Sequence, residues 1–298
     1  MPASDSPDDQ DRLEQLVGHP QAKRDALVDR IQADVVKSFQ AVEAGFLDLI
    51  WTLDTYRREQ VVPRGMGNIN VSSTDRRLEG IYRGKGNYFS TVIELILGQM
   101  TTSRLASRSD VQGFSQTHQI DIAWPARDQR PLRDPQICCE AKLTGAPPYL
   151  GNEGRDATAD WSNRRKELKF QATDLKLYRQ AQNTQIDNWD LWRRSAPPSV
   201  YSLWAARVTK PTDIEFMIRE AQILTATYSD GVGIYAFREN TGRDGYEPFP
   251  LAKGVSHRVT SLDSVLGYIA AQIRTVIAEN NDQVPAPVVP PAHPTSTD

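Results

Sequence analysis

The chain has 298 residues, of which 39% are hydrophobic and 24% are charged, and its formal net charge is −3 at pH 7. These values are typical of a globular protein with enough apolar material for one large domain or two smaller ones. The small net charge excludes a globally basic nucleic-acid binder, so any such surface must come from local clustering. The acidic start of the chain has no apolar signal core, and no run reaches the roughly 20 apolar residues of a membrane span. We therefore expect a soluble, cytoplasmic protein.

The only two cysteines, Cys138 and Cys139, are adjacent. A disulfide between neighbours is strained, and the histidines show no zinc-ligand spacing with this pair. We expect two buried strand thiols in a reducing compartment.

Residues 1–20 are polar and residues 281–298 form a Pro-rich tail, and we expect both segments to be disordered. Between Gln21 and about Gln60, apolar residues recur at helical spacing. Residues 21–80 are therefore predicted to form a helical amino-terminal region that ends in loops rich in Gly, Pro and Arg. The main domain is predicted over residues 81–280.

Helical and strand-like patterns alternate through the main domain. The predicted elements are a helix over 87–100, strands over 118–124 and 136–143, a helix over 161–180, a strand over 200–208, a helix over 212–228, a strand over 231–239 and a helix over 261–279. This order predicts an α/β fold with a central mixed β-sheet flanked by helices.

The strand predicted over 136–143 carries two charges, Glu140 and Lys142, in an otherwise apolar segment. Period-two geometry places them on the same face, about 7 Å apart along the chain. If this strand pairs with 118–124, Asp121 lies beside them. Two carboxylates and an ammonium in one place are costly to bury unless a divalent cation compensates. Mg²⁺ with a nearby lysine is suited to phosphodiester hydrolysis.

The pattern of Asp121, 18 intervening residues and then Glu140-Ala141-Lys142 resembles the D…(D/E)xK signature of the PD-(D/E)xK nucleases, which include most type II restriction endonucleases. The resemblance covers about 86–237 and implies a restriction-endonuclease-like core. It implies that Asp121, Glu140 and the carbonyl of Ala141 bind Mg²⁺, and that Lys142 is the catalytic lysine. Many members add a carboxylate from the preceding helix, and Glu94 has that place here. The chain departs from the pattern in one respect, because Ile rather than Pro precedes Asp121.

Simpler interpretations stay open for each residue. Glu140 and Lys142 can form an edge-strand ion pair, and Glu94 can be a helix-surface carboxylate or one that is satisfied in the core. His118 is expected to begin a strand rather than to act in catalysis. A second Glu-x-Lys, residues 167–169, lies in a charged helical segment where solvated side chains are expected.

Two basic clusters are candidates for contacts to phosphates. The first precedes the helix over 87–100, where Gly-rich backbone N–H groups can approach an anion. The second begins the helix over 161–180. The residues predicted to bind DNA are Arg83, Lys85, Asn87, Arg164 and Arg165.

From these residues we expect a Mg²⁺-dependent endonuclease, a type II site-specific deoxyribonuclease of a restriction–modification system. It would cut double-stranded DNA as a homodimer, with the long amino-terminal helix in the interface. Three alternatives remain open. They are a nuclease of the same fold without sequence preference that acts in repair or anti-phage defence, an inactive relative that binds DNA or protein, and an unrelated α/β protein with surface ion pairs.

Overall fold

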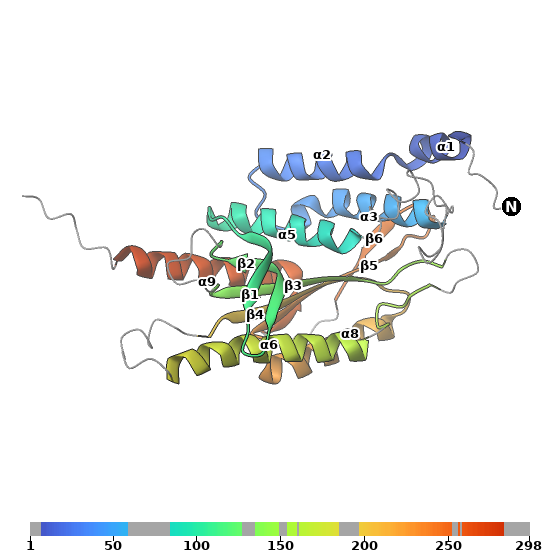
Figure 1. Cartoon of the computed structure of the whole chain (residues 1–298). Helices are drawn as coiled ribbons and strands as arrows, with labels where there is room; N and C mark the ends of the chain where they lie inside the picture. The colour runs from blue at the N-terminus through green and yellow to red at the C-terminus, as the bar shows by residue number, and fades with distance from the viewer. Residues whose placement is uncertain are drawn as a thin grey trace, which may run out of the picture.

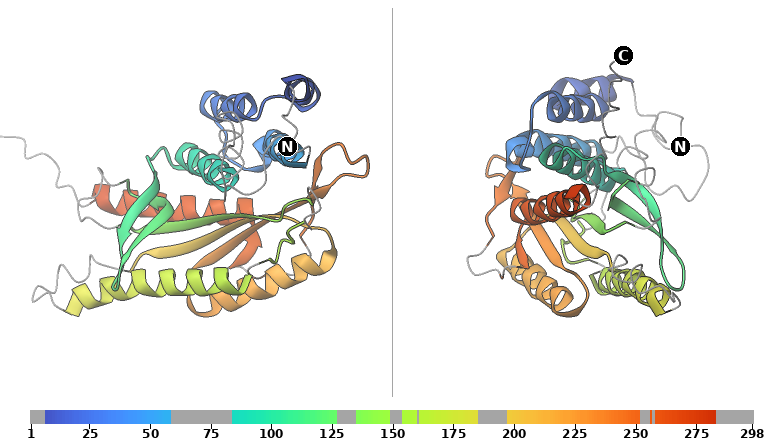
Figure 2. Two further views of the ribbon diagram at one scale, coloured as in Figure 1. Left: turned by 45° about the vertical axis from the view of Figure 1, so that its right-hand side comes forward. Right: turned by 90° about the vertical axis from the view of Figure 1, so that its left-hand side faces the viewer.

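The computed structural model describes residues 7–58, 84–126, 135–148, 154–159, 161–184, 197–251, 256 and 258–282. A central β-sheet lies between two layers of helices, as Figures 1 and 2 show. The helices are α1 (Pro7–Val17), α2 (Pro20–Ala33), the 3-10 helix η1 (Gln40–Val42), α3 (Glu43–Arg58), α5 (Lys85–Thr101), α6 (Trp161–Thr184), α8 (Pro211–Thr227) and α9 (Leu262–Asp282). Among the described helices, none combines the length and apolar character needed to cross a bilayer.

The sheet is mixed. Its strands are β1 (Ala106–Gln112), β2 (Thr117–Trp124), β3 (Ile137–Thr144), β4 (Ser199–Arg207), β5 (Gly231–Glu239), β6 (Tyr246–Phe249) and β7 (Val259–Ser261). The spatial order is β1-β2-β3-β4-β5-β6, with β7 paired to β5. The β1–β2, β2–β3 and β5–β6 pairs are antiparallel, whereas β3–β4, β4–β5 and β5–β7 are parallel. The predicted α/β class with a mixed sheet flanked by helices is confirmed.

Pairing between β2 and β3, on which the predicted site depends, is also confirmed. Ile122 lies opposite Cys139 and Trp124 opposite Ile137. Opposed residues of an antiparallel pair share a face, so the alternation of the two strands is in phase.

Each face of the sheet has its own apolar core. Residues of α2, α3, α5 and α9, such as Ile31, Phe46 and Phe89, cover one face. Met217 and Leu224 of α8 and Leu175 of α6 cover the other face. Strands β3, β4 and β5 are buried on both faces, which explains their nearly continuous apolar sequences.

The amino-terminal region differs in part from the prediction. Residues 1–20 were predicted to be disordered, but α1 occupies Pro7–Val17 and α2 begins at Pro20. Helices α2 and α3 fall where helical periodicity places them, and they pack in the same core as α5 and the sheet. Residues 59–83 and 283–298 lie outside the described part of the chain, so the predicted loops and most of the Pro-rich tail lie outside it as well.

Three strands were missed from the sequence. Strand β1, ASRSDVQ, is an edge strand that pairs with β2 alone in the described residues, and most of its side chains are exposed or half-buried. An exposed edge strand does not need the apolar alternation that identifies a strand from sequence. Strands β6 and β7 are only four and three residues long, too short to show a period.

Candidate active site

Strands β2 and β3 bring together the three charged residues that the sequence predicted to act as a unit. Cys139 and Ala141 of β3 pack in the core on the α5 side of the sheet. Because side chains alternate along a strand, Glu140 and Lys142 face α6 on the opposite side. Asp121 of β2 contacts both β3 and Lys142 from the neighbouring strand.

Asp121 lies where the backbone ladder between β2 and β3 ends. The last backbone pair is Ile122 with Cys139, one step before Asp121 and Glu140 would pair. The carboxylate of Asp121 replaces the missing strand contact, because its Oδ2 accepts a hydrogen bond from the backbone N–H of Ala141 at 2.9 Å. The strands therefore separate at the predicted site while Asp121 remains held against β3.

The ladder between β1 and β2 is interrupted at the same place. Pairs form on both sides of Arg108 and Asp121 but not between these two residues. Arg108 has a left-handed backbone, with φ of 47°, which is unfavourable for a residue with a side chain. Among the described residues of β2, Asp121 is thus the one that has no backbone pair with either neighbouring strand, β1 or β3.

Lys142 lies between the two carboxylates. Its Nζ is 2.9 Å from Oε2 of Glu140 and 3.7 Å from Oδ2 of Asp121. The second oxygen of Glu140, Oε1, accepts a hydrogen bond from Nε2 of Gln171 in α6 at 2.9 Å. The Glu140 side chain is only 5% exposed, whereas Lys142 and Asp121 are 29% and 24% exposed. Water therefore reaches one side of the group, while Glu140 forms its buried floor.

The charges in this group perturb one another. Burial raises the pKa of Glu140 above its usual value and Asp121 raises it further, although Lys142 opposes both effects. Burial alone would lower the pKa of Lys142, but the carboxylates of Glu140 and Asp121 outweigh it, so the pKa of the lysine is raised. Lys142 is consequently a cation at neutral pH.

A cavity of about 280 Å³ opens beside this group. Glu140 and Lys142 line it from β3, and Gln116, His118 and Gln119 line it from the β1–β2 hairpin. The remaining wall is supplied by α6, through Glu167, Leu168, Phe170 and Gln171. The cavity is mostly polar, and it is large enough for part of a substrate to reach Lys142.

The donor set fits a hard divalent cation. Among the residues that the structure describes, no three His, Cys, Asp or Glu side chains converge closely enough to hold a metal ion. Asp121 and Glu140 do share one ammonium, which shows that a positive charge is accommodated between them. Mg²⁺ commonly uses one or two carboxylates and completes its shell with water and substrate oxygens.

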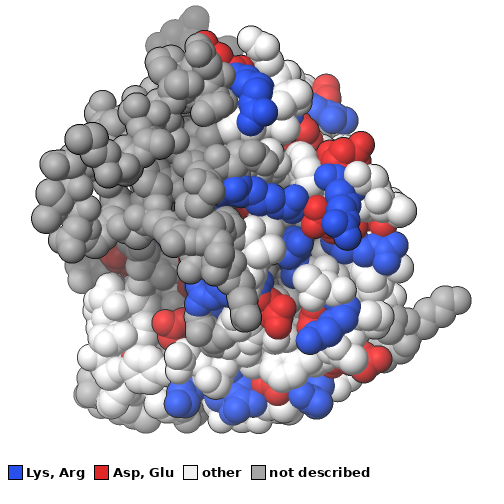
Figure 3. Space-filling model, turned by 90° about the vertical axis from the view of Figure 1, so that its right-hand side faces the viewer, with Lys and Arg blue, Asp and Glu red and all other residues white. Residues whose placement is uncertain are grey.

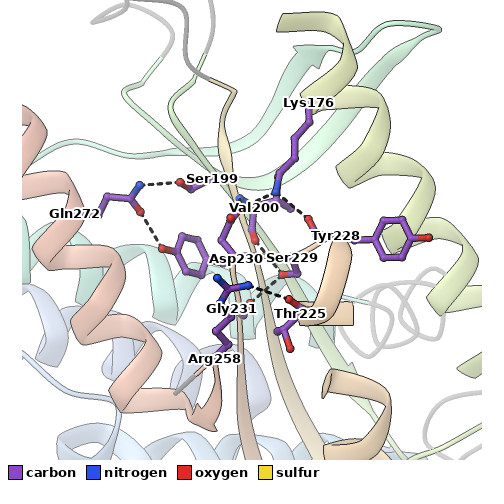
Figure 4. A network of polar contacts seen from close by, with 11 residues as sticks. Lys176, Ser199, Val200, Thr225, Tyr228, Ser229, Asp230, Gly231, Arg258 and Gln272 are labelled. Atoms are coloured by element: carbon purple, nitrogen blue, oxygen red, sulfur yellow. Dashed lines mark hydrogen bonds and ion pairs between the residues drawn. The ribbon is translucent and has the colours of Figure 1, made fainter. Parts of the chain in front are cut away.

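Helix α6 forms one wall of the site, and polar contacts to the sheet fix its position. Figure 4 shows Lys176 of α6 directed at the start of β5, where its Nζ donates to the carbonyl of Tyr228 and to Asp230, each at 3.0 Å. Asp230 also accepts the backbone N–H of Val200 in β4 at 2.7 Å. One carboxylate thereby joins α6 to the start of β4 and to the residue just before β5.

A second contact joins α6 to the β1–β2 hairpin. The carboxylate of Asp174 accepts hydrogen bonds from the backbone and hydroxyl groups of Ser115, each at 2.8 Å. It also bonds Nε2 of His118 at 2.8 Å, and both side chains of this pair are buried. Gln171 and Asp174 were not predicted from the sequence. No local pattern identifies them, because their role depends on how α6 lies across the sheet.

Glu94 lies apart from this group. Its carboxylate accepts a hydrogen bond from Ser107 of β1, and burial raises its pKa despite that bond and the nearby Arg104. Ser107 is opposite Ile122, which packs in the core on the α5 side. Glu94 therefore approaches the sheet from the face opposite to Glu140. The described contacts do not connect it with Asp121, so its predicted catalytic role has no geometric support.

Of the first predicted DNA-binding cluster, the structure describes Lys85 and Asn87. Lys85 is buried, and its Nζ contacts both oxygens of Asp54 in α3 at 2.8 and 2.9 Å. Tyr246 of β6 donates to the same carboxylate at 2.7 Å. The prediction that Lys85 contacts a phosphate is therefore corrected, because this ammonium neutralises a core carboxylate. Asn87 is exposed in the first turn of α5, and Arg83 lies outside the described residues.

The second cluster lies along the first turns of α6. Arg164 is half-buried, and burial together with the nearby Arg155 lowers its pKa. Arg165 is paired at 2.8 Å with Glu220 of α8, so its charge is already neutralised. On the face drawn in Figure 3, Lys and Arg side chains alternate with Asp and Glu over the described part of the surface. The described residues on this face therefore form no broad basic patch.

The second Glu-x-Lys sequence, residues 167–169 of α6, does not form a charged group like that of Glu140 and Lys142. Glu167 is exposed, as expected, but it also lines the cavity. Lys169 lies over the ring of Tyr228, with Nζ 4.8 Å from its centroid. Glu167 thus contributes to the wall of the cavity, whereas Lys169 packs on Tyr228.

No family model, curated protein or solved structure matches this chain.

Proposed function

We propose that this protein is a Mg²⁺-dependent endonuclease that hydrolyses DNA phosphodiester bonds. The proposal rests chiefly on one observation, that Asp121, Glu140 and Lys142 meet where two antiparallel strands separate, beside an open cavity. A structural ion pair would not require the ladders on both sides of Asp121 to break. Backbone strain such as that of Arg108 is concentrated at functional sites.

Asp121 and Glu140 would hold Mg²⁺ together with the carbonyl of Ala141, as the family resemblance implies. The bound ion would supply Lewis-acid polarisation of the phosphate and lower the pKa of a water. Gln171 orients Glu140, and the backbone N–H of Ala141 orients Asp121. Lys142 would donate a hydrogen bond to a non-bridging phosphate oxygen, where negative charge increases as water attacks phosphorus. The P–O3′ bond then breaks, which leaves a 3′-hydroxyl and a 5′-phosphate.

We expect Arg164, which lies near Arg155, to contact the nucleic-acid backbone. Arg155 follows β3 and forms a β-bridge with Ala146, while Arg164 lies one helical turn before Glu167 at the cavity. Burial and the nearby Arg155 lower the pKa of Arg164, while Glu167 opposes this shift, so an added phosphate would favour the charged form of Arg164. A phosphate bound there would lead a DNA strand along α6 toward Lys142.

The finer proposal is a type II site-specific deoxyribonuclease that acts as a homodimer on double-stranded DNA. The same site would serve equally in a nuclease without sequence preference. Digestion of a sequenced DNA separates the two, because a site-specific enzyme gives discrete bands and a nonspecific one gives a smear.

The experiment that tests the proposal is cleavage of plasmid and phage DNA by the purified chain in Mg²⁺ and in chelator. We expect cleavage with Mg²⁺ alone, and Asp121→Ala and Lys142→Ala should each reduce the rate by about 100-fold or more. Asp110→Ala, at an exposed carboxylate of β1, is the matched control and should cleave at the wild-type rate. Wild-type rates in both site variants would rule the proposal out.

A further inference from the structure

An exposed aromatic ring stands at the rim of the active-site cavity. Phe170 of α6 is 49% exposed, although a side chain of this size is usually buried. It lines the same cavity as Glu140 and Lys142. The hydrolysis described above makes no use of it.

The ring of Phe170 has a rigid support. Its edge-to-face contact with the ring of His118 has a centroid distance of 5.6 Å and an interplanar angle of 66°. His118 is fixed in turn by the buried Asp174, which the hairpin backbone also holds. An exposed ring whose support is preorganised loses little entropy when a ligand stacks on it.

Amide side chains complete this end of the cavity. Gln116 and Gln119 are exposed on the β1–β2 hairpin and line the cavity with Phe170. A glutamine presents both a donor and an acceptor, which is the combination that reads the edge of a nucleobase. An aromatic face beside amide groups is the usual way in which proteins bind an unpaired base.

We infer that this end of the cavity binds one unpaired nucleobase of the DNA substrate, stacked on Phe170, next to the phosphate that is cut. This inference rests on the proposed nuclease function and specifies the substrate further. A base inside a duplex has neighbours on both faces, so the nucleotide must be single-stranded or turned out of the helix. His118 and Asp174 are positioning residues, because they act through Phe170.

A second copy of this chain is a less suitable occupant of this surface. Phe114 and Leu177 are also exposed nearby, at 60% and 43%, and a dimer could cover them. The centre of a protein interface is depleted of charge, however. Here the surface leads into a cavity walled by Glu140, Lys142 and Glu167, which suits a polar ligand.

Abasic scanning of a DNA oligonucleotide tests the inference. An abasic residue replaces each nucleotide in turn, in single-stranded DNA and in a duplex, and affinity is measured without Mg²⁺ so that no cleavage occurs. The wild type should lose affinity by about 5- to 100-fold at one position, the value of one stacked base. Phe170→Ala should bind intact DNA with the same loss and should be insensitive to the abasic residue, and Phe170→Trp should restore binding. Leu177→Ala, on the same helix but outside the cavity wall, is the control.

The outcomes separate this inference from the function on which it rests. If the wild type cleaves DNA with Mg²⁺ and Phe170→Ala responds to the abasic residue as the wild type does, the stacking site is overturned and the nuclease stands. If Phe170→Ala and Leu177→Ala both convert a dimer to a monomer in sedimentation, a second copy covers the surface and the inference is again overturned. A wild-type chain that neither binds nor cleaves DNA overturns both proposals.

Discussion

Replacement of Lys142 by methionine isolates the charge at the centre of the site. Methionine keeps an unbranched apolar stem of similar length and removes only the ammonium. Glu140, with 5% of its side chain exposed, is then left with the hydrogen bond from Gln171 and the nearby charge of Asp121. We expect Lys142→Met to be less stable than the wild type in the absence of divalent cations.

The size of the loss follows from burial. Removal of one partner of a fully buried ion pair costs about 3–5 kcal/mol. Lys142 is 29% exposed, so water reaches this side of the pair, and we expect a loss of about 2 kcal/mol. For a domain of this size that corresponds to a decrease in Tm of about 4–8 °C.

The loss should depend on pH. Burial already raises the pKa of Glu140 in the folded wild type, and loss of Lys142 removes the group that opposes this shift. A carboxyl whose pKa is higher in the folded than in the unfolded chain binds protons more tightly when folded. The variant therefore gains stability as the pH falls from above the folded pKa toward the unfolded value of about 4.3. The stability deficit of Lys142→Met relative to the wild type should therefore shrink as the pH falls toward the unfolded pKa.

Urea unfolding at several pH values, in chelator and in Mg²⁺, measures both effects. At a Mg²⁺ concentration 100 times the Kd, the ion should restore about 2.7 kcal/mol, because it takes the place of the ammonium between the carboxylates. Lys166→Met, at an exposed position of α6, is the control and should change neither stability nor its pH dependence. A deficit that is equal at every pH, with no stabilisation by Mg²⁺, would refute this account of Glu140 and Lys142.

Two further predictions concern the supports of the site and of the core. Burial raises the pKa of Asp174, but hydrogen bonds from Ser115 and His118 outweigh it, so the pKa is lowered. The ionised carboxylate of Asp174 therefore stabilises the fold fully above the pKa of an unfolded aspartate, about 3.9. This stabilisation is lost as the pH falls through the lower pKa of the folded state. Asp174→Asn should lower the free energy of unfolding by about 1–3 kcal/mol near neutral pH and accelerate amide hydrogen exchange at Ser115 and Gln116. Unchanged exchange at these two amides would contradict the proposed role of Asp174 in holding the β1–β2 hairpin against α6. Asp54→Ala leaves Lys85 buried without its carboxylate and should cost about 3–5 kcal/mol in urea unfolding. The double variant Lys85→Met with Asp54→Leu should recover part of that lost stability and should bind DNA as the wild type does. Weaker DNA binding by the double variant would instead show that Lys85 contacts a phosphate.

The sequence predicted the sheet and the charged group through the same signal. Strand alternation fixes which residues share a face, so Asp121, Glu140 and Lys142 could be assigned to one surface before their strands were known to pair. The pairing of the two strands was an assumption at that point, and the structure confirms it. The alternation within each strand depends only on neighbouring residues, which is why it could be predicted from the sequence.

Residues whose partners are distant in sequence could not be predicted in this way. Lys85 follows a glycine in a basic segment and therefore indicated a surface cation, but Asp54, 31 positions earlier, supplies a buried partner. Glu94 is in the helix that the resemblance requires, yet the rotation of α5 directs it to Ser107. Gln171 and Asp174 gain their roles only from the way α6 crosses β2 and β3.

The ammonium of Lys142 between two carboxylates has a consequence for how the protein is handled. The site carries its own counter-ion, so the proposed binding of Mg²⁺ would not be needed for folding. If the proposed nuclease function is right, a chelator should stop DNA cleavage without unfolding the protein, and cleavage should return when Mg²⁺ is added. Protein purified in chelator would then be folded and inactive, and it would become active when Mg²⁺ is added.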